Sequence, residues 1–545
     1  MLLVDALLHE LELFNVKQLF GIPGDFVLPL FEQLQQRNKL PLYYLSHEPS
    51  AVFAADAAAR ISNKPSVVML TYGAGALNAV NAVAQAYVEH VPLVVIAGFP
   101  SEAEIKSGLQ IHHQAKNIDS QRDIYREITA CQVRLNNPEQ AGNDIRLALK
   151  TAKEQSLPVL IEIPRDAVSY HTELAADYIA PQPDAADIKQ AVAYLSQRLA
   201  AGQRPVIVAG VDVRRFAAVA ELEALASKLN IPFVSTLMGR ACVNQQHPLY
   251  QGIFLDKTDV RPAQLLRQAD LILQIGVIKT DSNFAANRDF FPTEKVIEIS
   301  ANKMLTADKI FNGISLKALL SSLLQQAIPP FSNQELATAP IENPKLKTET
   351  SQLTTTSVVQ QIDQQLIKTA LTVPFISDIG DCLFASLHAT PSLMLAPAFY
   401  ASMGYAVPAA LGVQAVTGLR PLVLVGDGAF LMTGLELGHF ARYGFAPIVV
   451  LFNNSGWDMI NAFSPNLNCT SLNNWHYAEL ARSMGGSGVQ VHSLDAFNLA
   501  LVAALENESQ FSLIEVVLST GSRTERLNNF AAGFKCTEKS AVVQC

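Results

Sequence analysis

One stretch of the sequence, residues 425–460, decides the fold: VGDGAFLMTGLELGHFARYGFAPIVVLFNNSGWDMI. An apolar run over 421–425 ends at Gly-Asp-Gly, and a helical pattern over 429–446 follows it. A second apolar run, 447–452, then ends at Asn-Asn. This order predicts a strand, a helix and a second strand parallel to the first.

Both predicted strands end on oxygen-bearing side chains. Asp427 offers a carboxylate and Asn454 an amide oxygen, and oxygen atoms of this kind are ligands that Mg²⁺ prefers. Ligands bind beyond the carboxyl ends of the strands in an open α/β sheet, and Gly426 and Gly428 let backbone amides approach a diphosphate there. The stretch therefore predicts a site for magnesium and a diphosphate. The alternative is two loops that only close parallel strands.

Length and composition limit the class of protein. The chain has 545 residues, of which 49% are hydrophobic and 16% charged, enough for about three or four domains. Its net charge of −9, without a basic block, gives no reason to expect a nucleic-acid partner. Six scattered cysteines lack metal-type spacing and favour a reducing cytoplasm. The acidic, amphipathic N-terminal segment is not expected to be a signal peptide, and no apolar run approaches the about 20 residues of a membrane helix.

Apolar runs alternate with helical stretches along the whole chain. This alternation predicts an α/β fold with three doubly wound domains and mostly parallel sheets. A first domain is expected over 1–170, a middle domain over 185–327 and a third over 353–525, with a polar linker at 328–352. The tail, 526–545, is expected to be of low order, with a flexible lid as the alternative.

The apolar runs also place the strands. A further polar, proline-bearing linker is expected over 173–183. The predicted strands are 17–20, 42–45, 67–71, 93–97 and 159–163 in the first domain, 206–209, 233–235, 271–275 and 296–299 in the middle domain, and runs around 375, 393, 423, 449 and 513–517 in the third.

Three loops of the first domain follow predicted strands and should meet at its carboxyl edge. They contain Asp25 in GIPGDF, Glu48 in SHEP and Thr71 in TYGAG. A partly desolvated Glu48 at this edge suits a carboxyl that shares a proton with a heterocycle. The alternative is that Glu48 only complements a helix dipole at the start of the following helix.

Two adjacent histidines, His112 and His113, follow an apolar run between the fourth and fifth strands. Adjacent residues of a regular element face in different directions, so one ring should face a cavity while the other braces it. The sequence offers no third ligand with zinc-type spacing. This favours an acid or base relay over a metal site.

These motifs together resemble a known family. GDF at Asp25, SHEP at Glu48, the pair His112-His113 and the stretch from GDG to NN resemble the thiamine diphosphate-dependent 2-keto acid decarboxylases, most closely the phenylpyruvate and indolepyruvate decarboxylases. The resemblance covers residues 3–521. It implies thiamine diphosphate and Mg²⁺ as cofactors, bound by a pyrimidine-binding first domain and a diphosphate-binding third domain. It also implies decarboxylation of a 2-oxo acid to an aldehyde and CO₂ through a thiamine diphosphate enamine.

The resemblance assigns cofactor roles by position. Magnesium is expected on Asp427, Asn454 and the backbone carbonyl of Gly456. Glu48 corresponds to the glutamate that bonds the aminopyrimidine ring, and Met403 to the bulky residue that bends the cofactor. Without the resemblance, Met403 would be core filler. Further cofactor contacts are expected from Thr71, Asp381, Ala401, Gly426, Gly428, Ala429 and Trp457.

The resemblance also assigns catalytic roles, with one departure from the family. Asp25, His112 and His113 correspond to the groups that handle substrate and product protons, and Asp281 to a middle-domain acid that reaches the same cavity. The family often has Glu four residues after the glycine that corresponds to Gly456, where this chain has isoleucine. Either Asp281 or Asp25 is then expected to take over part of its work, or apolar surroundings destabilise the substrate carboxylate.

That isoleucine is Ile460, and its neighbour Asp458 should not replace the missing acid. On a helix the two side chains point about 200° apart. A second departure is Asp381 in SDIGDC, where the family more often has E-x-G-T-S. Because Asp381 stands where a threonine hydroxyl usually meets the diphosphate, that contact is open.

The substrate and the assembly are also expectations. Ile460 with Leu383, Phe384, Trp457 and Phe463 predicts an apolar pocket, which favours phenylpyruvate or indole-3-pyruvate over pyruvate or a branched-chain 2-keto acid. A carboligase of the acetolactate synthase type and a catalytically silent α/β protein are the rival interpretations. In the family the cofactor bridges the first domain of one chain and the third of another, which implies a homodimer at least and favours a homotetramer.

Overall fold

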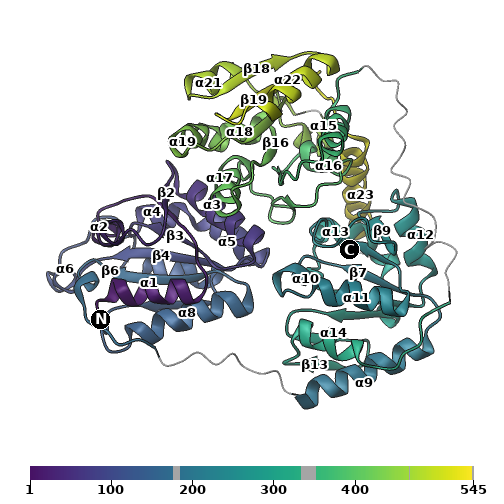
Figure 1. Ribbon diagram of the computed structural model, residues 1–545, viewed down its shortest axis with the longest axis horizontal. Coiled ribbons are helices and arrows are strands. Elements are labelled where there is room, and N and C mark those ends of the chain that lie inside the picture. The colour runs from purple at the N-terminus through teal and green to yellow at the C-terminus, as the bar shows by residue number, and fades with distance from the viewer. Residues whose placement is uncertain (176–184, 333–351, 466, 543–545) are drawn as a thin grey trace.

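The structure is a computed structural model that describes residues 1–175, 185–332, 352–465 and 467–542. In these ranges the chain forms three α/β domains, each built on one sheet (Figure 1). The predicted fold class is therefore confirmed. Most of the expected linkers, 173–183 and 328–352, lie outside the described residues.

The first sheet is fully parallel, with strand order β2-β1-β3-β4-β6-β5. Its strands are β1 (Leu19–Gly21), β2 (Leu42–Tyr44), β3 (Ser66–Leu70), β4 (Leu93–Phe99), β5 (Cys131–Arg134) and β6 (Val159–Pro164). Its helices are α1 (Leu3–Leu13), α2 (Leu28–Arg37), α3 (Glu48–Ser62), α4 (Ala74–Asn78), α5 (Val80–Val88), α6 (Glu102–Lys106), α7 (Ser120–Tyr125) and α8 (Ala141–Gln155), with 3₁₀ turns η1 (Arg126–Ile128) and η2 (Ala167–Ser169). The central strands β3 and β4 are buried along their whole length, as their apolar runs predict.

The middle sheet has the order β13-β12-β11-β10-β7-β8-β9. Its strands are β7 (Pro205–Ala209), β8 (Phe233–Ser235), β9 (Tyr250–Ile253), β10 (Leu271–Ile275), β11 (Val296–Ile299), β12 (Lys303–Leu305) and β13 (Ile310–Asn312). Its helices are α9 (Ala185–Ala201), α10 (Asp212–Arg215), α11 (Val219–Leu229), α12 (Val260–Gln268), α13 (Asp281–Phe284) and α14 (Leu316–Leu324), with 3₁₀ turns η3 (Ala285–Phe290) and η4 (Thr293–Lys295). The pairings of β12 with β11 and with β13 are antiparallel, so this sheet is mixed at one edge.

The third sheet is parallel, with the order β15-β14-β16-β17-β19-β18. Its strands are β14 (Phe375–Ser377), β15 (Met394–Leu395), β16 (Leu422–Gly426), β17 (Ile448–Asn453), β18 (Ser487–Val491) and β19 (Ser512–Val517). Its helices are α15 (Thr355–Thr369), α16 (Asp381–Ser386), α17 (Ala406–Thr417), α18 (Asp427–Thr433), α19 (Leu437–Tyr443), α20 (Asp458–Phe463), α21 (Tyr477–Ser483), α22 (Leu494–Glu506) and α23 (Glu525–Val542), with 3₁₀ turns η5 (Gly434–Glu436) and η6 (Asn468–Thr470). The predicted parallel pair on either side of GDG is β16 and β17, adjacent in register.

Two expectations about helices are wrong. The single helix expected over 429–446 is broken into α18, η5 and α19, because Thr433 leaves helical geometry at φ −144° and donates its hydroxyl to Gly404 O at 2.7 Å. The tail, expected to be of low order, contains α23, which packs on α16 and α20.

The first and third domains pack directly on each other through α3 and α17, which lie together in Figure 1. Small residues make this possible: α3 is rich in buried alanines, and a Cβ at Gly412 would lie 1.9 Å from Ala54 O. The two sheets therefore share one apolar core. In the described ranges, none of the helices combines the length and the apolar character needed to cross a membrane.

Candidate active site

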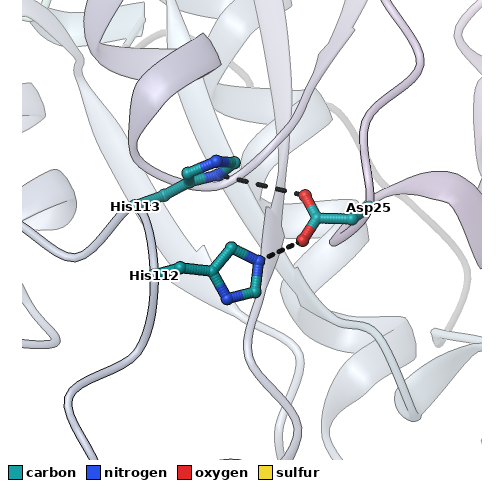
Figure 2. Close-up of side chains that lie close together, drawn as sticks. All are labelled: Asp25, His112 and His113. Atoms are coloured by element: carbon teal, nitrogen blue, oxygen red, sulfur yellow. Dashed lines mark hydrogen bonds and ion pairs between the residues drawn. The ribbon is translucent and has the colours of Figure 1, made fainter.

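Asp25, His112 and His113 form one cluster at the edge of the first sheet (Figure 2). His112 Nε2 is hydrogen-bonded to Asp25 Oδ2, and His113 Nδ1 lies 3.9 Å from Asp25 Oδ1. Thr71 Oγ1 donates to Asp25 Oδ1 at 3.2 Å. The loops after β1 and β3 thus meet, as the carboxyl-edge rule predicts.

The cluster packs against an aromatic ring, and its His112 side chain is exposed. The ring of Phe26 contacts both imidazoles, with its centroid 4.7 Å from that of His112 and 6.0 Å from that of His113. Gly73 has φ +59°, and a Cβ there would lie 1.9 Å from His113 O, so only glycine fits beneath this loop. The His112 side chain keeps 61% of its surface exposed, which leaves it accessible to a substrate.

Electrostatics keep Asp25 ionised. Burial acts to raise the pKa of Asp25, but hydrogen bonds from His112 and Thr71 outweigh it and hold that pKa below its usual range. Asp25 also supplies the third ligand-type group that the sequence did not reveal, since its carboxylate and the two imidazoles have atoms within 4.8 Å of one another. The direct hydrogen bond between carboxylate and imidazole suits proton transfer.

Glu48 is the first residue of α3, at the same edge. Its Oε2 accepts a hydrogen bond from Asn78 Nδ2 at 2.7 Å, and its Oε1 lies 3.4 Å from the position of a Cβ at Gly75. The side chain is half-buried and has no cationic partner among these contacts. A carboxyl group held by one amide keeps an oxygen available for a heterocycle.

The carboxyl edge of the third sheet brings Asp427, Asn454 and Gly456 together. Gly456 N donates to Asp427 Oδ2 and to Asn454 Oδ1, each at 3.2 Å. Asp427 is 2% exposed, and its other oxygen accepts from Gly428 N at 2.8 Å. Burial raises the pKa of Asp427 to about 6, against the lowering effect of these backbone amides. A buried carboxylate beside an amide oxygen is a donor set that fits Mg²⁺.

Trp457 indicates that a further polar ligand fits beside this edge. Its Nε1 is buried and has no hydrogen-bond partner in the described chain. A Cβ at Gly428 would lie 2.1 Å from the indole, whereas a Cβ at Gly426 meets nothing within 4 Å. Ala429 is buried next to them. An orphaned indole N–H, glycine backbone and the N-terminus of α18 suit a diphosphate.

Met403 lies in a turn that buried carboxylates hold. Ala401 has φ +63° and Gly404 φ +85°, and the Met403 side chain between them is 41% exposed. Asp378 accepts hydrogen bonds from Gly404 N at 3.1 Å and from Ala406 N at 2.8 Å. Burial raises the pKa of Asp378 to about 6. The turn therefore presents Met403 outward from a fixed backbone.

Comparisons with known proteins identify the family. The N-terminal TPP binding domain of thiamine pyrophosphate enzymes matches residues 1–123, the central domain 192–326 and the C-terminal TPP binding domain 378–516. Indole-3-pyruvate decarboxylase of Azospirillum brasilense is 36% identical over 542 residues, which cover 98% of both chains. The chain belongs to the thiamine diphosphate-dependent 2-keto acid decarboxylase family. Alpha-keto-acid decarboxylases of Mycolicibacterium paratuberculosis and Mycobacterium avium are both 28% identical, over 94% of this chain and 93% of theirs.

One departure from the family pattern gains a structural reason. Asp381 Oδ1 accepts from Thr524 N at 2.9 Å and from Thr524 Oγ1 at 2.6 Å, just before α23 begins. Asp381 thus anchors the C-terminal helix, while its Oδ2 is buried without a partner. Its expected contact with the diphosphate of this family's cofactor stays a prediction.

The residues expected to form the substrate pocket lie at different depths. Leu383 and Phe384 are 1% and 2% exposed and pack in an apolar cluster with α23. Ile460 is 47% exposed, and the Phe463 ring lies 6.4 Å from Phe530 of α23. Leu383 and Phe384 are therefore buried beside α23, and Ile460 is the side chain of this set that is most accessible to a substrate.

Asp281 does not join the Asp25 cluster within one chain. It begins α13, is exposed, and its Oδ1 accepts from Ser282 N at 2.8 Å. It lines a middle-domain cavity of about 790 Å³ with Lys279 and Arg288. Among the contacts of the described residues, none links Asp281 to Asp25, so its catalytic role stays a prediction.

Sequence reasoning missed Asp378 and one acid of the first domain, Glu89, which both hold the segment around Met403. Glu89 Oε1 accepts from Phe399 N at 2.8 Å and from Tyr400 N at 2.9 Å, and its Oε2 pairs with buried Arg60 at 2.6 Å. Asp378 directly follows β14, so the rule that singled out Asp427 would have found it. No local pattern marks Glu89.

Proposed function

We propose that this chain is a decarboxylase that uses thiamine diphosphate and Mg²⁺ to convert an aromatic 2-oxo acid, phenylpyruvate or indole-3-pyruvate, to the aldehyde and CO₂. The observation that carries the proposal is the cluster at a sheet edge of a thiamine-enzyme fold in which Asp25 is hydrogen-bonded to His112 and lies 3.9 Å from His113. The relative from Azospirillum brasilense, named indole-3-pyruvate decarboxylase, supports the aromatic substrate.

The two sheet edges have the groups to hold the cofactor. Asp427 Oδ2, Asn454 Oδ1 and the Gly456 carbonyl would hold Mg²⁺, and Trp457 Nε1 would donate to the diphosphate. Glu48, held by Asn78, would bond the pyrimidine ring. When bound, thiamine diphosphate supplies the electron sink for loss of CO₂.

The protein's own acids and bases would manage the protons. Asp25 stays ionised beside two imidazoles, so a proton held on either ring is stabilised by the neighbouring negative charge. His113 and Asp25 would deliver the proton that completes the aldehyde, with His112 in support. Because an imidazole nitrogen can either accept or donate a proton, the cluster can take up and release a proton in each cycle.

The side chains expected to line the substrate pocket support an aromatic substrate. Ile460 is exposed where the family often has Glu. Leu383, Phe384 and the Phe463 ring pack against α23, which contacts α20, the helix of Ile460. An apolar wall stabilises an aryl group by removing its surface from water, and it disfavours an ionised carboxylate, which promotes loss of CO₂. Pyruvate or a branched-chain 2-keto acid would leave part of this surface uncovered.

Product analysis tests the reaction type. Purified protein supplied with thiamine diphosphate, Mg²⁺ and phenylpyruvate should release CO₂ and the aldehyde in equal amounts. A hydroxyketone as the main product would assign the chain to carboligase chemistry instead. Cofactor binding without CO₂ release from any 2-oxo acid would support a catalytically silent binding protein.

We further propose an assembly of two chains at least, with a homotetramer favoured, in the cytoplasm. Glu48 and the Asp427 set lie in different domains, and no contact described within one chain links them. A partner chain would supply the second half of each site. Sedimentation at assay concentration should show active dimers or tetramers, and an active monomer would refute the shared site.

A further inference from the structure

Asp458 is a buried carboxylate that directly contacts a proposed metal ligand. It begins α20 and is 3% exposed. Its Oδ2 accepts from Asn454 Nδ2 at 2.8 Å, and its Oδ1 accepts from Asn461 Nδ2 at 3.1 Å. The helix geometry correctly points Asp458 away from the exposed Ile460, and the direction it takes instead leads to Asn454.

This contact decides which atom of Asn454 faces the metal site. An amide group has one oxygen and one nitrogen, and a carboxylate can only accept hydrogen bonds. Asp458 therefore engages Asn454 Nδ2, which leaves Oδ1 on the side of Gly456 N, 3.2 Å away. Without the carboxylate, the amide could turn and present a nitrogen, which cannot bind Mg²⁺.

The same carboxylate oxygen also holds the chain that leads to α23. Gly521 N donates to Asp458 Oδ2 at 3.1 Å. Three residues later, Thr524 is bound by Asp381, and α23 begins at the next residue. One oxygen of Asp458 thus bonds both the proposed metal ligand and the C-terminal segment.

We propose that Asp458 is a positioning residue: it orients Asn454 Oδ1 toward Mg²⁺ and fastens the C-terminal segment at Gly521 to the loaded site. This rests on the proposed function, because it takes Asp427, Asn454 and Gly456 as the metal ligands. Partners that orient a ligand commonly change metal affinity by about 10–100-fold when they are removed. Asp458 itself need not touch the metal or the substrate.

The test compares Asp458→Asn with Thr524→Val in the full-length protein. Both variants loosen the C-terminal segment, but only Asp458→Asn alters the partner of Asn454. The chain has two tryptophans, so a Trp475→Phe background leaves Trp457, which lies in the site, as the single fluorescent reporter. Mg²⁺ is titrated at saturating thiamine diphosphate, and hydrogen exchange follows the amides of Gly521 and Thr524.

Asp458→Asn should raise the Kd for Mg²⁺ about 10–100-fold and speed exchange at Gly521. Thr524→Val should speed exchange near Thr524 and leave the Kd for Mg²⁺ unchanged. Excess Mg²⁺ should restore CO₂ release by Asp458→Asn. Should Asp458→Asn fold poorly, Asp458→Glu keeps the charge but moves it, and its Kd for Mg²⁺ should rise in the same direction.

Two results would overturn the inference while leaving the proposed function intact. One is an unchanged Kd for Mg²⁺ in a folded Asp458→Asn protein that still needs Mg²⁺ to release CO₂. The other is an equal rise in that Kd for Thr524→Val, which would place the effect in the C-terminal helix. A wild-type protein without any response to thiamine diphosphate and Mg²⁺ would instead refute the proposed function, and the inference with it.

Discussion

Asp25 and His112 are joined by a hydrogen bond although 87 positions separate them in the sequence. The loop after β1 supplies the carboxylate, and the loop between α6 and α7 supplies the imidazole. Parallel strands bring both loops to one edge, where Thr71 from the loop after β3 adds a second hydrogen bond to Asp25. The proposed proton chemistry depends on this meeting of three loops.

Replacing Asp25 with asparagine should remove activity without unfolding the protein. The variant keeps the shape of the side chain but loses the negative charge beside His112 and His113. We expect kcat for phenylpyruvate to fall by about 10²–10⁴-fold, the usual contribution of a positioned acid or base. Thiamine diphosphate binding should be unchanged, since Asp25 is not among the proposed cofactor ligands. A wild-type kcat would exclude Asp25 from the reaction.

Mg²⁺ binding should weaken as the pH falls through about 6. Burial raises the pKa of Asp427 to about 6, so below that pH the proposed ligand is protonated and neutral. At pH 5 about one tenth of the Asp427 side chains are then ionised, against about nine tenths at pH 7. The apparent Kd for Mg²⁺ should therefore be about tenfold higher at pH 5 than at pH 7. Titration of Trp457 fluorescence at the two pH values measures this. A Kd that is equal at pH 5 and pH 7 would contradict it.

The same ionisation affects stability in a defined direction. The folded pKa of Asp427 is raised above its unfolded value, so without metal the free energy of unfolding should fall as pH rises from about 4 to about 6. Mg²⁺ offsets the buried charge, so its stabilising effect in thermal unfolding should be larger at pH 7 than at pH 5. In Asp427→Asn this difference should disappear.

Gly428→Ala should destabilise the protein, whereas Gly426→Ala should have little effect. A Cβ at Gly428 would lie 2.1 Å from the Trp457 indole, but a Cβ at Gly426 meets no atom within 4 Å. Overpacking of this kind costs about 1–3 kcal/mol in free energy of unfolding. Chemical denaturation of the two variants gives a matched comparison. Equal free energies of unfolding would show that the indole moves aside freely.

Ile460→Glu should change substrate preference more than stability. Ile460 is 47% exposed, and substitutions at such positions usually change the free energy of unfolding by less than about 0.5 kcal/mol. A carboxylate there should lower kcat/KM for phenylpyruvate relative to pyruvate, because it makes the apolar wall polar. An unchanged ratio of the two specificity constants would remove Ile460 from the pocket.

Strands buried on both faces could be predicted from the sequence, whereas five short or half-exposed strands could not. The runs around β3, β4, β16 and β17 are apolar throughout and were found nearly at their observed positions. The five missed strands, β5, β9, β12, β13 and β18, are short or half-exposed, as in the alternating SGVQV of β18. Exposed faces tolerate polar residues, which removes the apolar run that marks a buried strand.

The candidate site was predictable where one rule, the carboxyl edge of parallel strands, places the residues. That rule brought Asp25 to Thr71 and Asp427 to Asn454. The meeting of His112 and His113 with Asp25 was expected only from the family resemblance. It could not show that Asp458 contacts Gly521, since that contact depends on how the chain returns after β19. Nor could composition show that the polar tail forms α23, because its apolar residues matter only through packing on α16 and α20.

The most direct test of the central claim is a CO₂-release assay across 2-oxo acids, with and without thiamine diphosphate and Mg²⁺. We predict release that requires both cofactors, with the highest kcat/KM for phenylpyruvate or indole-3-pyruvate. The highest kcat/KM for pyruvate would contradict the aromatic substrate, and release that is independent of the cofactors would contradict the proposed site.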